Sequence, residues 1–354
     1  MNAQFTQHNL IFKQASGTSR GVLTTKETYL LEISENNKKG IGECAIFRGL
    51  SYDDVPDYEE KLTWLCKNIN LDFEVLKKEL LHYPSIIFGL EQALLNLEHG
   101  EDLYFPSDFT DGKDSIKING LIWMGNADFM QSQIEEKLAK GFDCIKLKIG
   151  VDWKSEKEII KKLREKFPKE QLELRVDANG AFSYEEATIV LQELADLGIH
   201  SIEQPIKKSQ VKSKKSQETD EINSTDCCIP WNDMAKLCAE TPTPIALDEE
   251  LIGVIDFEEK KKLLETIKPQ YIILKPALVG GFSGSDEWIA IAESLGINWW
   301  ITSALESNIG LNAICQYTYT KKNPLPQGLG TGALFTNNFE THLQLEGDQM
   351  WHKK

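Results

Sequence analysis

Three features that would each define a class of protein are missing from this sequence. Its 354 residues include seven cysteines, an odd number with no C-x-x-C pair, so neither a disulfide framework nor a zinc finger is expected. No segment approaches the ~20 consecutive apolar residues of a membrane span. Residues 1–10 lack the basic region and apolar core of a signal peptide. We therefore expect a protein of the reducing cytoplasm without a membrane partner.

Basic residues are also fewer than acidic residues in this sequence. The chain has 39 lysines and arginines against 55 aspartates and glutamates, a formal net charge of −16. This balance argues against nucleic acid or an anionic membrane as the main partner, although a few inward-facing cations could still bind a small carboxylate substrate. The length is too great for one small core. The oligomeric state is not readable from the sequence.

A regular strand and helix pattern begins near residue 115. Apolar runs predict strands at 116–121, 143–149, 172–177, 200–203, 244–248, 271–275 and 298–302. Helices are expected near 127–139, 153–166, 183–197, 231–240, 256–266, 282–295 and 306–320. Most intervals between successive charged strand ends are a little shorter than the ~30 residues of a strand–helix–strand unit. The pattern therefore predicts an α/β fold, a parallel barrel whose last short strand lies near 329–331.

The regions outside this pattern set the expected domain boundaries. Residues 1–112 contain strands followed by helices, which indicates a separate α+β domain. Residues 207–226 are almost wholly polar and lengthen one interval of the barrel domain, 113–332, so they are expected to form a solvated insertion. The tail, 333–354, is expected to pack on the first domain.

Three carboxylates end consecutive predicted strands: Asp177, Glu203 and Asp248. The C-terminal ends of barrel strands carry catalytic groups, and unpaired carboxylates gathered there would repel one another. A divalent cation removes the repulsion, and all-oxygen ligation favours Mg²⁺, or Mn²⁺ in its place, over zinc. The sequence leaves open a second interpretation, in which each carboxylate pairs with a barrel lysine.

Lysines flank these carboxylates on both sides. Lys146 and Lys148 lie on one face of the second predicted strand, and Lys275 ends the sixth. A lysine can act as a general base when burial and neighbouring positive charge lower its pKa. A lysine beside a metal ion suits removal of a proton α to a carboxylate. Proton abstraction from a carbon acid is therefore the expected reaction core.

These motifs resemble a known family. They are Lys146-x-Lys148, Asp177-Ala178-Asn179, Glu203-Gln204-Pro205, Asp248-Glu249 and Lys275, and together they resemble the lysine-based, muconate-lactonising-enzyme-like subgroup of the enolase superfamily. The resemblance implies a (β/α)7β modified TIM barrel with an N-terminal α+β capping domain, and Mg²⁺ bound by the three carboxylates. No histidine lies between residues 202 and 341, which argues against the subgroup with a late histidine base.

Within this subgroup, Arg175, Ser303–Gly310 and Gly328–Gly332 resemble the dehydratases of menaquinone biosynthesis. The Ser303–Ser307 segment is expected to begin a helix whose amide groups could bind a carboxylate. The resemblance implies syn loss of water from 2-succinyl-6-hydroxy-2,4-cyclohexadiene-1-carboxylate, with Lys148 as the base and Lys275 as a cation on the opposite face. The substrate contacts implied by the resemblance are Lys146, Arg175, Asn179, Ser303 and Arg20. Of these, Arg20 belongs to the capping domain, and it would close over the substrate together with Ser19.

Two other functions stay open. An N-acylamino-acid racemase or dipeptide epimerase would use Lys148 and Lys275 as bases on both faces of its substrate. A metal-dependent binding protein without catalytic activity is also conceivable, because a fold never fixes a function by itself.

Overall fold

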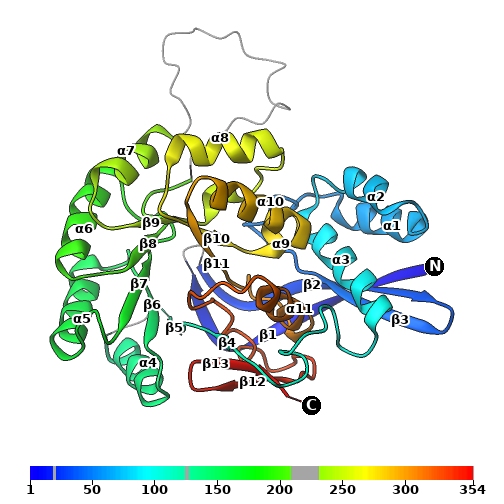
Figure 1. The fold of residues 1–354 in the computed structure, drawn as a ribbon, viewed down its shortest axis with the longest axis horizontal. Helices are drawn as coiled ribbons and strands as arrows, with labels where there is room; N and C mark the ends of the chain where they lie inside the picture. The colour runs from blue at the N-terminus through cyan, green and yellow to red at the C-terminus, as the bar shows by residue number, and fades with distance from the viewer. Residues whose placement is uncertain (19–20, 124–126, 209–230, 354) are drawn as a thin grey trace, which may run out of the picture.

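The computed structural model describes residues 1–18, 21–123, 127–208 and 231–353 (Figure 1). The predicted lid residues Ser19 and Arg20 lie outside these ranges, as does all but the beginning of the 207–226 insertion. Across the described ranges, no helix is long and apolar enough to cross a membrane.

The N-terminal part is an antiparallel sheet covered by helices. Its strands pair in the order β1 (Asn2–Thr18), β2 (Gly21–Glu35) and β3 (Lys38–Cys44). The helices are α1 (Tyr58–Asn68), α2 (Phe73–Glu79) and α3 (Pro84–His99). Helix α3 packs closely on β3 because both lack side chains at the contact: a Cβ added to Gly42 would lie 1.9 Å from the Gly89 carbonyl oxygen.

Seven parallel strands form the curved sheet predicted from the repeating pattern. They are β5 (Gly120–Ile122), β6 (Cys144–Lys148), β7 (Glu173–Asp177), β8 (Ser201–Glu203), β9 (Ile245–Leu247), β10 (Tyr271–Leu274) and β11 (Asn298–Ile301), hydrogen-bonded in chain order. The outer helices are α4 (Ala127–Ala139), α5 (Trp153–Lys166), α6 (Tyr184–Asp196), α7 (Asn232–Glu240), α8 (Phe257–Ile267), α9 (Pro276–Val279), α10 (Gly281–Ser294) and α11 (Asn308–Thr320). The architecture is a modified TIM barrel with an N-terminal capping sheet, as expected.

The barrel closes differently from the prediction. The closing contacts are two isolated parallel bridges, Ile118 with Gln327 and Thr302 with Gly328. They precede the predicted last strand at 329–331. Gly328 permits the close approach, because a Cβ there would lie 2.1 Å from the Thr302 hydroxyl oxygen. The predicted first strand, 116–121, is also divided, since β4 (Ile116–Lys117) pairs outside the barrel.

The C-terminal residues contact both parts of the molecule. Strands β12 (Leu343–Glu346) and β13 (Gln349–His352) form a hairpin that pairs with β4 (Figure 1). Just before it, the Lys13 amide of β1 donates to the Leu334 carbonyl, and Phe12 bridges Phe335. The division of the chain at residues 112 and 332 stays a prediction.

Candidate active site

The charged residues singled out in the sequence converge at the C-terminal ends of the barrel strands. Parallel register aligns Lys148 with Asp177 and Asp177 with Glu203 on β6, β7 and β8. Asp248 and Lys275 immediately follow β9 and β10. The three carboxylate residues are at most 2% exposed. The strand ends therefore gather five ionisable groups in a place from which water is largely excluded.

Each carboxylate has a lysine partner. Lys148 Nζ donates to Asp177 Oδ2 at 2.9 Å, and Lys146 Nζ donates to Glu203 Oε2 at 2.7 Å. Lys275 Nζ donates to Asp248 Oδ2. The lysine–carboxylate pairing that the sequence left open is thus observed, and it lets the ammonium groups offset the repulsion between the carboxylates.

The pairing leaves two of the three carboxylates under-compensated. Burial and the Asp177 charge raise the pKa of Glu203 to about 7, and burial raises the pKa of Asp248 although the Lys275 charge opposes the shift. Burial also acts on Asp177, but the charges of Lys148 and Lys146 outweigh it and lower the Asp177 pKa. Burial opposes the charge of Lys275 as well, yet Asp248 and the other nearby carboxylates raise its pKa. Lys275 is therefore held as an ammonium group.

A fourth carboxylate, absent from the predicted site, joins the group. Glu249 directly follows Asp248, and its Oε1 accepts a hydrogen bond from Asn179 Nδ2 at 3.1 Å. Glu249 Oε2 and Glu203 Oε1 are buried and make no hydrogen bond within the described structure. The four carboxylates named here outnumber the three lysine ammonium groups, so the strand ends keep an excess of negative charge that would attract a cation. Oxygen donors of this kind suit Mg²⁺, and the site fits the predicted metal.

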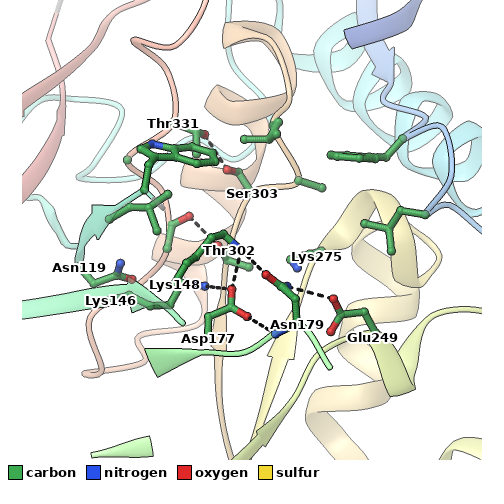
Figure 2. A pocket seen from close by; sticks show the side chains of 18 residues that line it. Asn119, Lys146, Lys148, Asp177, Asn179, Glu249, Lys275, Thr302, Ser303 and Thr331 are labelled. Carbon is green, nitrogen blue, oxygen red and sulfur yellow. Dashed lines mark hydrogen bonds and ion pairs between the residues drawn. The ribbon is translucent and has the colours of Figure 1, made fainter. Parts of the chain in front are cut away.

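The cavity beside these groups brings both parts of the molecule together. Figure 2 shows its lining, which includes Lys146, Lys148, Asp177, Asn179, Lys275 and Ser303 from the predicted site. Ser303 Oγ is hydrogen-bonded to Thr331 Oγ1 at 2.6 Å. The capping part contributes Phe47 and Leu50. The predicted contact Arg20 lies outside the described residues.

Arg175 does not line the cavity. Its Nε donates to Glu173 Oε1 at 2.7 Å, its Nη1 donates to the Pro326 carbonyl at 2.9 Å, and its guanidinium lies 4.2 Å from the centre of the Trp300 ring. Arg175 faces inward like Asp177 but lies one layer lower in the barrel. It is therefore placed in the barrel floor, beneath the predicted substrate site.

Several residues that line the cavity were not predicted from the sequence. Asn119, Leu121 and Trp123 alternate along β5 and its ends and all reach the cavity. Such alternation is a period-two signal that the sequence does contain. Phe47 and Leu50 carry no comparable signal, because their position depends on how the capping sheet meets the barrel.

The predicted binding of a substrate carboxylate by the main-chain amides of Ser303–Ser307 stays a prediction, and the structure gives the helix that follows a different partner. Helix α11 begins only at Asn308, and its first amide groups already have a partner. Glu43 of β3 accepts hydrogen bonds from the Ser307 amide at 3.0 Å and the Gly310 amide at 2.9 Å. The helix N-terminus therefore binds a carboxylate of the capping sheet, which fixes the segment that lines the cavity.

Comparison with known proteins agrees with this geometry. The family model "Enolase C-terminal domain-like" matches residues 130–221 and 226–349. The o-succinylbenzoate synthase of Desulfotalea psychrophila is 41% identical, and the alignment covers 98% of each chain. The chain belongs to the o-succinylbenzoate synthase family of the enolase superfamily. The crystal structure of MenC from the same organism matches it with a TM-score of 0.84 and 39% identity over 99% of both chains.

A more distant solved structure shares the fold alone. It is the dipeptide epimerase of Enterococcus faecalis complexed with Mg and the dipeptide L-Leu-L-Tyr, with a TM-score of 0.81 and 18% identity over 100% of this chain and 97% of that one. An enzyme with this fold therefore binds magnesium together with a dipeptide.

Proposed function

We propose that this enzyme dehydrates 2-succinyl-6-hydroxy-2,4-cyclohexadiene-1-carboxylate to o-succinylbenzoate in menaquinone biosynthesis. The observation that carries the proposal is the 41% identity, over 98% of both chains, with an o-succinylbenzoate synthase. The site chemistry agrees with it, because lysines and carboxylates meet at one cavity. The reaction class is that of a hydro-lyase: a C–H bond and a C–O bond break, water leaves, and the ring becomes aromatic.

Lys148 is the proposed base. Its Nζ lies on the cavity wall between Asp177 Oδ2, at 2.9 Å, and Asn179 Oδ1, at 2.5 Å. Those two oxygens would orient the amine towards the proton α to the substrate carboxylate. The same nitrogen, once protonated, would return the proton to the departing hydroxyl group, so that loss of water is syn.

Asp177, Glu203 and Asp248 are the proposed ligands of Mg²⁺, with Mn²⁺ as a substitute. When bound, the ion supplies positive charge for the carboxylate that gains electron density as its α-proton leaves. Glu203 Oε1, which lacks a hydrogen-bond partner in the described structure, is available to such an ion.

Lys275 is proposed to act as a fixed cation. It lines the same cavity and is held by Asp248. One base is sufficient for a syn elimination, so Lys275 would stabilise the developing negative charge without giving up its proton. Lys146, Asn179 and Ser303 are the proposed substrate contacts on the barrel side, and Arg20 is the one proposed on the capping side.

An N-acylamino-acid racemase or dipeptide epimerase is the second candidate. The observation that favours it is that both Lys148 and Lys275 reach one cavity. A substrate between them would have an amine on each face, as a two-base racemase requires.

A cytoplasmic location is also proposed. The described cysteines, Cys44, Cys66, Cys144, Cys238 and Cys315, are all free, as expected in a reducing compartment.

The test is dehydration of the cyclohexadiene substrate by purified protein with Mg²⁺, followed by ultraviolet absorbance. We expect chelation by EDTA to abolish turnover and Lys148→Ala to lower kcat by at least ~10²-fold, as loss of a general base does. Lys154→Ala, which removes an exposed lysine at the start of α5, is the matched control and should retain activity.

Absence of turnover in folded, metal-loaded protein would overturn this assignment. The second candidate would then be tested by exchange of α-hydrogens in N-acylamino acids and dipeptides in D₂O. A racemase would exchange hydrogens on both faces, and Lys148→Ala and Lys275→Ala would each remove one of the two exchange reactions.

A further inference from the structure

A second group of metal-ligating side chains lies away from the catalytic lysines. Asp102 is in the connection between α3 and β4, His342 immediately precedes β12, and His352 is in β13. Strand β13 pairs with β4, which precedes β5 in the chain (Figure 1). The group therefore lies towards the N-terminal ends of the barrel strands, whereas Lys148 lies at their C-terminal ends.

The three side chains converge on one carboxylate oxygen. Asp102 Oδ2 is 2.6 Å from His342 Nδ1 and 3.0 Å from His352 Nε2. Throughout the described ranges, these residues form the one group of three His, Cys, Asp or Glu side chains whose ligand atoms all lie within 4.8 Å of one another. The residues come from three separate segments, so only the tertiary structure brings them together.

The hydrogen-bond geometry of His352 requires a positive ion, either a proton or a metal ion, between its ring and Asp102. The His352 side chain is fully buried, and its Nδ1 is 3.2 Å from the Thr110 carbonyl oxygen. A carbonyl can only accept, so Nδ1 carries a hydrogen. In a neutral ring, Nε2 would then present a lone pair to Asp102 Oδ2, which is also an acceptor. Two acceptors 3.0 Å apart require either a proton or a metal ion between them.

The surroundings of Asp102 favour a metal ion. Asp102 Oδ1 is buried and has no hydrogen-bond partner in the described structure. The Asp102 main chain is fixed in place, because its carbonyl accepts from Asn312 Nδ2 at 2.9 Å and from Gln316 Nε2 at 2.7 Å, both on α11. The His342 side chain is 44% exposed, which leaves room for a water ligand on the solvent side.

We propose that Asp102, His342 and His352 bind a transition-metal ion of the Zn²⁺ type. Two imidazole nitrogens and one carboxylate oxygen, with water as the fourth ligand, form a usual zinc ligand set, whereas Mg²⁺ prefers oxygen ligands throughout. The bond from His352 Nδ1 to the Thr110 carbonyl is the outer contact that metal-binding histidines usually make. The ion would join the β12–β13 hairpin to the connection that leads into the barrel.

The test is calorimetric titration of the chelator-treated full chain with Zn²⁺ in excess Mg²⁺, supported by the visible spectrum of the Co²⁺-substituted protein. We expect one Zn²⁺ per chain and a raised thermal midpoint. His342→Gln, at a half-exposed position, should fold normally and bind Zn²⁺ at least about tenfold more weakly, and Asp102→Asn should do the same. His82→Gln removes an exposed histidine elsewhere and should bind like the unmodified protein.

Binding at the catalytic carboxylates is distinguished by Asp177→Asn, which should keep the Zn²⁺ site. The proposal is overturned if the unmodified chain binds no Zn²⁺ in excess Mg²⁺, or if His342→Gln, folded by circular dichroism, binds it undiminished. In that case, a proton would lie between His352 Nε2 and Asp102 Oδ2 in place of a metal ion. Dehydration activity is unaffected by either result, so this test is independent of the proposed function.

Discussion

Among single residues, Arg175 shows how a buried charge can support a site without touching it. The side chain is 1% exposed and stacks on Trp300 beneath the cavity, and two of its nitrogens have hydrogen-bond partners. A guanidinium suits this position because it is planar and offers donors in a fixed fork, which an ammonium group does not. The floor of the barrel therefore depends on the shape of this side chain as well as its charge.

Arg175→Lys should lower the free energy of unfolding by about 1–3 kcal/mol, because lysine cannot keep both hydrogen bonds and the stacking contact. Any loss of turnover should appear in kcat, since Arg175 is absent from the cavity wall. Urea unfolding and steady-state kinetics measure the two effects.

Arg164→Lys is the matched control, because Arg164 lies on the outer helix α5 and donates to the Leu197 and Leu172 carbonyls, away from the cavity. It should lose stability without any change in kcat. A large rise in KM at constant kcat in Arg175→Lys would instead indicate direct substrate binding.

At the scale of elements, one buried carboxylate joins a helix of the capping part to a helix of the barrel. Glu91 of α3 accepts hydrogen bonds from the Phe282 amide at 2.5 Å and the Ser283 amide at 3.2 Å, in the first turn of α10. Burial raises the pKa of Glu91 to about 7 although these donors oppose the shift. The contact between the capping helix and the barrel therefore depends on the protonation state of Glu91.

The stability contributed through Glu91 should fall as pH rises. In the unfolded chain a glutamate ionises near its usual pKa of ~4.3, and in the folded chain Glu91 ionises near 7, so the folded state binds more protons between these values. The free energy of unfolding should thus decrease from about pH 4.3 to about pH 7, by at most about 4 kcal/mol from this group.

Glu91→Gln should flatten this part of the pH profile, measured by denaturant unfolding from pH 4.5 to 8. The control is Glu185→Gln, which removes an exposed carboxylate in the first turn of another helix, α6. Parallel profiles for Glu91→Gln and the unmodified protein would show that Glu91 does not control this dependence.

For the molecule as a whole, the charge imbalance at the strand ends links metal binding to stability. The proposed ligands come from three neighbouring strands, β7, β8 and β9, and a ligand that binds only the folded state stabilises all of it. We expect the thermal midpoint to rise with Mg²⁺ concentration, by the equivalent of about 2.7 kcal/mol at 100 times Kd.

Differential scanning calorimetry measures this effect, with KCl at equal ionic strength as the control. Asp177→Asn, which removes one proposed ligand, should lose most of the Mg²⁺-dependent rise. An equal rise in this variant would place the stabilising ion elsewhere.

The sequence by itself determined the barrel and the identity of its charged strand ends. Regular apolar runs specify parallel strands, and their C-terminal ends must meet at one edge, so Lys148, Asp177 and Lys275 were placed correctly without coordinates. The family resemblance followed from the same residues. The overall fold could be predicted because its period is local along the chain.

Only the tertiary structure decided the contacts between distant segments. Lysine–carboxylate pairing, the layer occupied by Arg175 and the partner of the α11 N-terminus all depend on how deep a side chain lies in the barrel or on where the capping sheet meets it. Asp102, His342 and His352 are the clearest case, because two of them are about 240 residues from the third. Periodicity describes faces within one element, and it carries no information about which elements of different domains come into contact.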